Sequence, residues 1–162
     1  MSDHDDTFRT AADRPALEKM LDWQRGEIVG LLDGLTEEQA RRRLVPSLTT
    51  LLGLVKHATF VERVWFHSRV AGRSREEVGL PGTVDESFTL TDDDTIATIT
   101  AEFEAACARS REIAAEHPDL AERFPWRDGP VSLRFVYAHM AQEYARHAGH
   151  GDILREQILA AG

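Results

Sequence analysis

A carboxylate and three imidazoles recur at helical spacing near the C-terminal end of the chain. Residues 139–150 read H-M-A-Q-E-Y-A-R-H-A-G-H and contain His139, Glu143, His147 and His150. Side chains four residues apart lie on one face of a helix, with Cβ atoms about 5–6 Å apart. Glu143 can therefore share a metal ion with His147 or with His139. The two histidines are about 12 Å apart along the axis, so they cannot both bind the same ion.

The apolar stripe of this segment favours the pair Glu143 and His147. At about 100° per residue, His147 falls near the middle of the stripe and Glu143 slightly off it, whereas His139 and His150 fall at its edge. The apolar residues that define the stripe are Leu133, Val136, Tyr137, Met140, Tyr144, Leu154 and Ile158. A buried carboxylate is costly unless it is paired or binds a metal. A buried Glu–His pair, or a glutamate that reaches an arginine, explains the same pattern without a metal.

Four long segments have helical periodicity, and none has the alternation of a strand, so the sequence predicts an all-α four-helix bundle. The chain, residues 1–162, is expected to form one domain, with residues 1–12 flexible. The expected long helices cover residues 14–33, 49–70, 92–116 and 132–159.

Local signals predict where these helices begin. Thr36 and Gln39 form a capping box for a short helix, and Thr91 and Asp94 form another for the third long helix. The second long helix is expected to be capped by Ser47 or Thr49, and the fourth by Ser132. Residues 72–91 have no clear period and are expected to form a loop that lies near the site and covers it.

A third ligand can come from the second long helix. His57 lies within the apolar arc between Leu54 and Val61, where a histidine is more often a satisfied core residue than a ligand. Together with Glu143 and His147 it would supply three ligands across a bundle, leaving a position open, as in catalytic zinc sites. Nickel, iron and manganese also suit these donors.

Two further polar residues of this helix have other expected places. Glu62 falls at the edge of the inward side, where it can contact the ligands, or pair with Arg63 or with a neighbouring helix. His67 is expected at the surface. The competing triad is His57, His139 and Glu143.

Composition and charge restrict the classes of partner. A net charge of −9 and a pI near 5.2 argue against binding to nucleic acid or an anionic membrane. No apolar run approaches the roughly 20 residues of a membrane span, and the start M-S-D-H-D-D lacks signal-peptide features, so a cytoplasmic protein is expected. The single cysteine, Cys107, is expected to be a buried, inert thiol, so a thiol nucleophile would have to come from a separate molecule.

Two stretches resemble a known family. Residues 32–66, L-D-G-L-T-E-E-Q-A-R-R-R-L-V-P-S-L-T-T-L-L-G-L-V-K-H-A-T-F-V-E-R-V-W-F, and residues 131–156, V-S-L-R-F-V-Y-A-H-M-A-Q-E-Y-A-R-H-A-G-H-G-D-I-L-R-E, are similar to the DinB-like superfamily. The similarity is greatest to its actinobacterial branch of mycothiol-dependent S-transferase-type proteins, and it extends over nearly the whole chain after residue 14. It implies an up-down-down-up bundle, often dimeric, with a metal bound by His57, Glu143 and His147. Glu143 stands where the family often has histidine, and it resembles the His/Glu/His site of mycothiol-dependent maleylpyruvate isomerase.

The resemblance also implies the chemistry. The expected activity is a metal-dependent S-transfer in which a low-molecular-weight thiol, mycothiol, attacks an electrophilic small molecule as a metal-bound thiolate. Zinc is the favoured metal, and His150 or Glu62 could transfer the proton. One alternative is a thiol-dependent isomerase of the maleylpyruvate type. The other is a non-catalytic module that binds a metal or ligand in a stress response.

Overall fold

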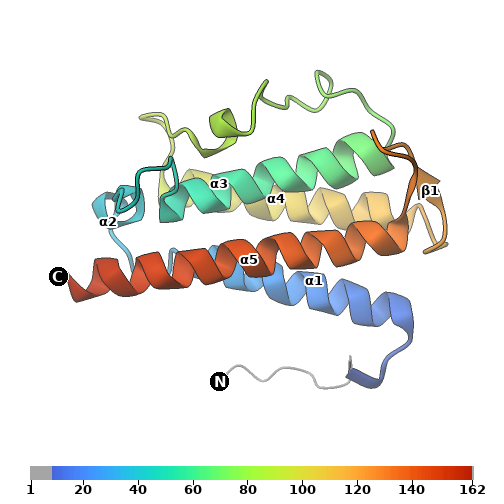
Figure 1. Cartoon of the computed structure of the whole chain (residues 1–162), viewed down its shortest axis with the longest axis horizontal. Coiled ribbons are helices and arrows are strands. Elements are labelled where there is room, and N and C mark those ends of the chain that lie inside the picture. The colour runs from blue at the N-terminus through green and yellow to red at the C-terminus, as the bar shows by residue number, and fades with distance from the viewer. Residues whose placement is uncertain (1–8, 162) are drawn as a thin grey trace.

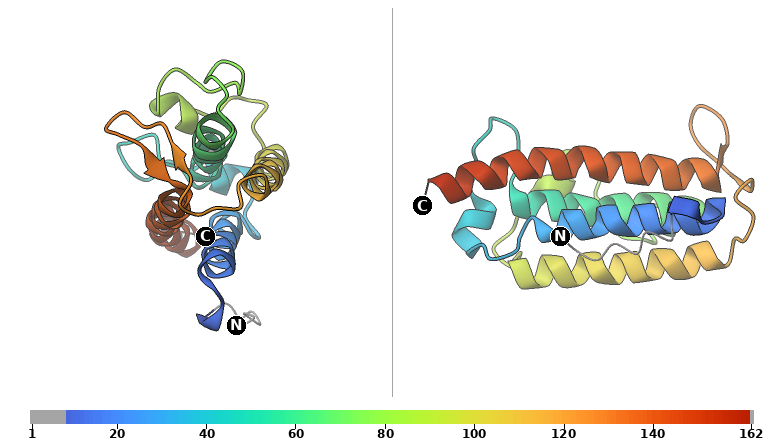
Figure 2. Two further views of the ribbon diagram at one scale, coloured as in Figure 1. Left: turned by 90° about the vertical axis from the view of Figure 1, so that its right-hand side faces the viewer. Right: turned by 90° about the horizontal axis from the view of Figure 1, so that it is seen from below.

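Four long helices lie side by side in the computed structural model, which describes residues 9–161 (Figures 1 and 2). They are α1 (Asp13–Gly30), α3 (Leu51–Glu62) with its continuation η2 (Arg63–Val70), α4 (Ile96–Ala115) and α5 (Leu133–Ala160). Helices α1 and α5 run in one direction and α3 and α4 in the other, which confirms the all-α, up-down-down-up bundle. Most of the segment expected to be flexible, residues 1–8, lies outside the described residues.

The connections follow from this order. Because α3 and α4 are parallel, residues 71–95 must return along the whole bundle, and Figure 1 shows this crossover passing over α3. The crossover contains one turn of 3₁₀-helix, η3 (Asp85–Phe88), and the shorter connection before α3 contains α2 (Glu37–Arg41). The connection before α5 includes a small antiparallel pair, β1 (Arg123–Phe124) and β2 (Val131–Ser132).

Two predicted helix starts are confirmed. Thr36 and Gln39 form a complete capping box at α2, and the Ser132 hydroxyl accepts a hydrogen bond from the backbone N–H of Phe135 at the start of α5. The side-chain oxygens satisfy backbone N–H groups that have no partner within the helix.

Two other starts lie further along the chain than predicted. Helix α3 is capped by Thr50, and α4 begins at Ile96 with a capping box of Thr95 and Thr98. The Asp94 carboxylate does accept a hydrogen bond from the backbone of Thr91, at 2.6 Å, but it also binds Lys56 of α3 at 2.7 Å. The turn between Thr91 and Asp94, which was predicted to start the third long helix, therefore attaches the crossover to α3, and α4 begins after this turn.

The C-terminal half of the second long helix is wound as a π-helix, Arg63–Val70. A π-helix has more residues per turn than an α-helix, so positions projected at 100° per residue are wrong beyond Glu62. His67, which was expected at the surface, is half-buried against α4, and its Nε2 lies 3.0 Å from the carbonyl oxygen of Ala106 and 3.2 Å from Ser110 Oγ.

The core is formed by the apolar faces of all four long helices. No helix within residues 9–161 is both long and apolar enough to cross a membrane. The largest completely buried apolar side chains are Tyr144, Phe66, Phe103, Leu21, Ile28, Leu51, Leu52, Leu54, Ile99, Ile113, Leu133 and Met140.

Candidate metal centre

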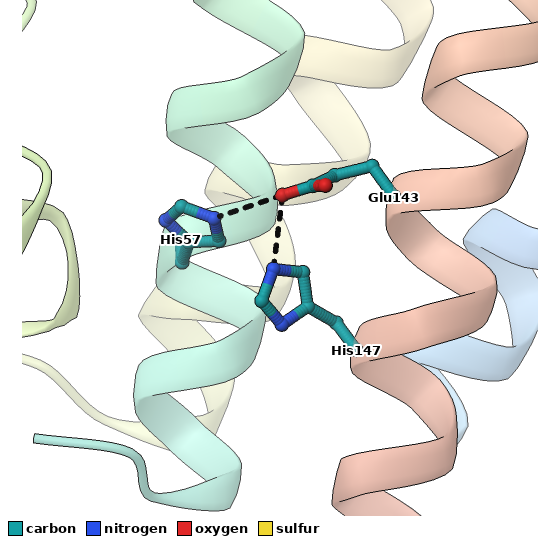
Figure 3. A group of neighbouring side chains, drawn as sticks. All are labelled: His57, Glu143 and His147. Carbon is teal, nitrogen blue, oxygen red and sulfur yellow. Dashed lines mark hydrogen bonds and ion pairs between the residues drawn. The ribbon is translucent and has the colours of Figure 1, made fainter. Parts of the chain in front are cut away.

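Helices α3 and α5 bring His57, Glu143 and His147 together, as Figure 3 shows. One ligand atom from each of the three residues lies within 4.8 Å of the others. Glu143 Oε1 is 3.0 Å from His147 Nε2 and 3.7 Å from His57 Nε2. Glu143 and His147 are one turn apart on α5, and His57 faces them from α3. The structure thus has the three predicted residues in one group.

The group is partly exposed to solvent through Glu143 and His147. The His57 side chain is 6% exposed, whereas those of Glu143 and His147 are 26% and 17% exposed. Within residues 9–161, no fourth histidine, cysteine, aspartate or glutamate belongs to the group. Three protein ligands with a solvent-accessible side resemble a catalytic metal site more than a closed structural site.

The charges of the group suit a dication. The hydrogen bond with His147 and the nearby ring of His57 lower the pKa of the Glu143 carboxyl well below its usual range, so this group is a carboxylate at neutral pH. Burial lowers the pKa of His57, although the nearby Glu143 carboxylate opposes the effect, so its imidazole is neutral at neutral pH. Among the described residues, the ion-pair partners of Glu143 are these two histidines. A dication bound by the three side chains would more than offset the single negative charge of Glu143, and two imidazoles with one carboxylate are typical zinc donors.

The competing residue, His139, lies outside the group. Its ring packs against Trp65, at a centroid distance of 4.4 Å, and stacks on Phe135 at 5.7 Å. It lies one turn from Glu143 on the side opposite His147, and its half-buried ring fills the space between α5 and η2. The structure therefore assembles the triad with His147 and not the one with His139.

The two residues considered for proton transfer differ in exposure. His150 is exposed, and its ring centroid is 6.0 Å from that of His147, so it lies at the rim of the group. Glu62 is completely buried and forms a bidentate ion pair with Arg25 of α1, at 2.8 and 2.9 Å. Burial alone would raise the pKa of Glu62, but Arg25 more than offsets this and holds the pKa below its usual value. This environment favours a role for Glu62 in holding helices together.

All four long helices contribute to the polar cluster around Glu62. The Tyr144 hydroxyl of α5 lies 2.9 Å from Glu62 Oε1 and 3.0 Å from the carbonyl oxygen of Ala58 in α3. Helix α4 adds Cys107, whose Sγ is 3.7 Å from Glu62 Oε1. The thiol is buried, and burial raises its pKa, so it is unsuited to be a nucleophile. Arg25, which sequence reasoning overlooked, could have been noticed as an arginine within the apolar stripe of α1.

The crossover contributes two residues that the sequence did not indicate. Ser87 Oγ is 2.8 Å from His57 Nδ1, and the ring of Phe88 stacks on His57 with centroids 4.1 Å apart. Segment 72–91 thus contacts the site as expected, but Ser87 binds the nitrogen of His57 that points away from Glu143. A cavity of about 430 Å³, lined by Lys56, Phe60 and Ser87 among others, lies beside this segment and is not lined by the three candidate ligands.

Comparison with known proteins places the chain in a family. The family model described as mycothiol-S-transferase matches residues 16–160, a range that includes every residue of the group and of the cluster beneath it. A search of curated proteins finds no match. Because the family match extends over most of the 162 residues, the resemblance found in the sequence is confirmed, and the chain belongs to the mycothiol-S-transferase family.

Proposed function

We propose that this protein is a metal-dependent thiol S-transferase that uses mycothiol as its thiol substrate. The observation that carries the proposal is the three-residue group His57, Glu143 and His147, which is partly exposed to solvent and belongs to a mycothiol-S-transferase chain. Zinc is the favoured ion, because two imidazoles and a carboxylate are common zinc ligands, although nickel, iron or manganese would also fit.

The three side chains would hold the ion and leave a position for the thiol. A bound dication favours the thiolate form of a coordinating thiol, and the thiolate is the nucleophile. The buried Cys107 cannot take this part, so the sulfur comes from the small-molecule thiol. In the transfer, the sulfur forms a bond to an electrophilic carbon, and the group displaced from that carbon leaves with the bonding electrons. His150, exposed beside His147, is the proposed acceptor of the thiol proton.

Homodimer formation and a cytoplasmic location are proposals that follow from the family resemblance and from the composition. The buried, ion-paired state of Glu62 leaves it unable to contact a substrate, so we assign it a supporting role beneath the site.

Two measurements test the proposal. Untagged, dialysed protein should contain about one zinc per chain, and it should consume mycothiol in the presence of a reactive alkyl or aryl halide. Removal of the metal with a chelator should abolish the reaction, and added zinc should restore it. Glutathione at the same concentration serves as the matched control for thiol selectivity.

The outcomes separate the candidate functions. A transferase consumes one thiol for each electrophile, whereas an isomerase returns the thiol unchanged. Protein that binds zinc tightly, consumes no thiol with a range of electrophiles and does not isomerise maleylpyruvate in the presence of thiol would support the non-catalytic alternative. Protein that binds no metal yet transfers the thiol at the same rate would contradict the metal-dependent mechanism.

A further inference from the structure

The position of one proton can be assigned at the contact between His57 and the crossover. Ser87 is 3% exposed, and its Oγ lies 2.8 Å from His57 Nδ1. The same hydroxyl also donates a hydrogen bond to the carbonyl oxygen of Val84. A serine hydroxyl has one proton, and a carbonyl oxygen can only accept. The Ser87 proton is therefore used at Val84, and Ser87 Oγ must accept a hydrogen bond from Nδ1–H of His57.

The tautomer of His57 follows from this. A neutral imidazole carries one proton, so a protonated Nδ1 leaves Nε2 with a free lone pair. Nε2 is the atom that lies 3.7 Å from Glu143 Oε1, on the side of the ring that faces the other two ligands (Figure 3). Metal-binding histidines generally donate their second ring N–H to an acceptor, which fixes the tautomer and the ring orientation. Ser87 fulfils this requirement from a different part of the chain.

The segment that carries Ser87 is seated firmly on α3. A Cβ atom added at Gly53, one turn before His57, would lie 3.1 Å from the carbonyl oxygen of Phe88, so glycine permits the backbones to approach. The Lys56 ammonium group donates to the carbonyl oxygen of Thr89 at 2.8 Å. Together with the stacked ring of Phe88, these contacts hold the hydroxyl of Ser87 in place.

We propose that Ser87 is a positioning residue for His57, and that ion binding at His57, Glu143 and His147 and the seating of η3 on α3 stabilise each other. This inference rests on the proposed function, because it requires that the three residues bind a metal. It adds that the crossover is part of the site, although the crossover supplies no ligand. Since binding free energies are reciprocal, an ion that favours the seated segment must also be bound more tightly because of it.

The first test needs no metal. Nitrogen-15 NMR of the histidine rings in metal-free protein, above the pKa of His57, should show protonated Nδ1 and unprotonated Nε2 for this residue. Ser87→Ala should shift the tautomer population toward Nε2–H. A wild-type His57 protonated at Nε2 would overturn the inference directly, whatever the metal affinity.

The second test measures zinc affinity by competition with a chromophoric chelator. Ser87→Ala should weaken zinc binding about 10- to 100-fold, the usual effect of losing such a partner. Thr89→Val is the matched control, because Thr89 Oγ1 supports the same turn through a 3.1 Å bond to the carbonyl oxygen of Asp85 and does not contact His57. It should change affinity less than about threefold. Hydrogen exchange of residues 84–89 should slow when zinc binds to the wild type, and slow less in Ser87→Ala.

Failure of this inference can be distinguished from failure of the proposed function. If the wild type binds zinc and Ser87→Ala binds it equally well, only the positioning role is wrong. An equal loss in Ser87→Ala and Thr89→Val would assign the effect to the turn and not to the hydrogen bond. If the wild type binds no zinc, the proposed function fails, and the coupling between metal and segment fails with it.

Discussion

Replacing His147 by alanine, with His139→Ala as its control, tests the geometry of the candidate metal centre. Both histidines lie one turn from Glu143 on α5, and both rings are partly buried against aromatic neighbours. Only His147 belongs to the three-residue group, with its Nε2 3.0 Å from Glu143 Oε1. We expect His147→Ala to lose zinc and His139→Ala to retain it.

The size of the effect can be estimated from the number of ligands. Four-ligand zinc sites bind with about 10–16 kcal/mol, or about 2.5–4 kcal/mol for each ligand. At 1.4 kcal/mol for each tenfold change, the loss of His147 should weaken binding on the order of 100-fold or more. Each substitution also removes a ring from a packed environment, which typically costs about 1–3 kcal/mol of folding stability. Stability therefore cannot distinguish the two variants, whereas metal affinity can.

The assay is zinc stoichiometry and chelator competition on folded, dialysed protein, with circular dichroism as the check on folding. Full zinc affinity in His147→Ala, together with its loss in His139→Ala, would refute the assignment. The ligand set would then be His57, His139 and Glu143, and the rotation of α5 about its axis would be wrong. Equal loss in both variants would indicate a general effect of packing at this face.

Three other substitutions, and Gly149→Ala as a control, test the helix packing of the bundle. Glu62→Gln should lower the free energy of unfolding by up to about 3–5 kcal/mol in urea titrations, because the buried Arg25 loses its bidentate partner and keeps only its ion pair with the more exposed Asp22. Burial would raise the pKa of Asp22, but hydrogen bonds from two arginines lower it overall, so Asp22 stabilises the fold above its unfolded pKa and that contribution disappears as the pH falls through its folded pKa. Asp22→Asn should therefore lose less stability than the wild type when the pH falls below about 4. An identical pH dependence of the unfolding free energy in the two proteins would contradict this. Gly151→Ala should destabilise the fold by about 1–3 kcal/mol, because the added Cβ would lie 2.4 Å from the buried side chain of Leu31, the residue that follows α1. Gly149→Ala, with nothing within 4 Å of the added Cβ, should leave the thermal midpoint unchanged or raise it.

The sequence was sufficient to predict the candidate ligands because they depend on short-range periodicity. Glu143 and His147 lie on a regular helix, where spacing alone fixes their mutual position. His57 lies in α3 before the π-helix begins, so its projected direction was also correct. The family resemblance and the apolar stripe pointed to the same three residues.

The parts that could not be predicted depend on contacts between distant segments. The direction of His67 was wrong because the helix changes its winding after Glu62, and no local pattern signals a π-helix. Ser87 lies 30 residues after His57 in a segment without periodicity, so only the folded crossover shows that the two are in contact. The start of α4 was misplaced because Asp94 is used to bind Lys56.

Helix α5 carries two of the three candidate ligands and a hydrogen bond that fixes their distance from α3. Glu143 points toward the metal centre, and the next residue, Tyr144, points into the core, where its hydroxyl lies 3.0 Å from the carbonyl oxygen of Ala58. Ala58 in turn follows His57, so the two helices are joined one residue beyond each ligand. The same hydroxyl lies 2.9 Å from the carboxylate of Glu62, which is paired with a cation from α1. Buried ion pairs add little net stability, since desolvation offsets most of their attraction. Their directional hydrogen bonds, however, restrict how α3 and α5 can slide or rotate, and a site built from both helices depends on that restriction.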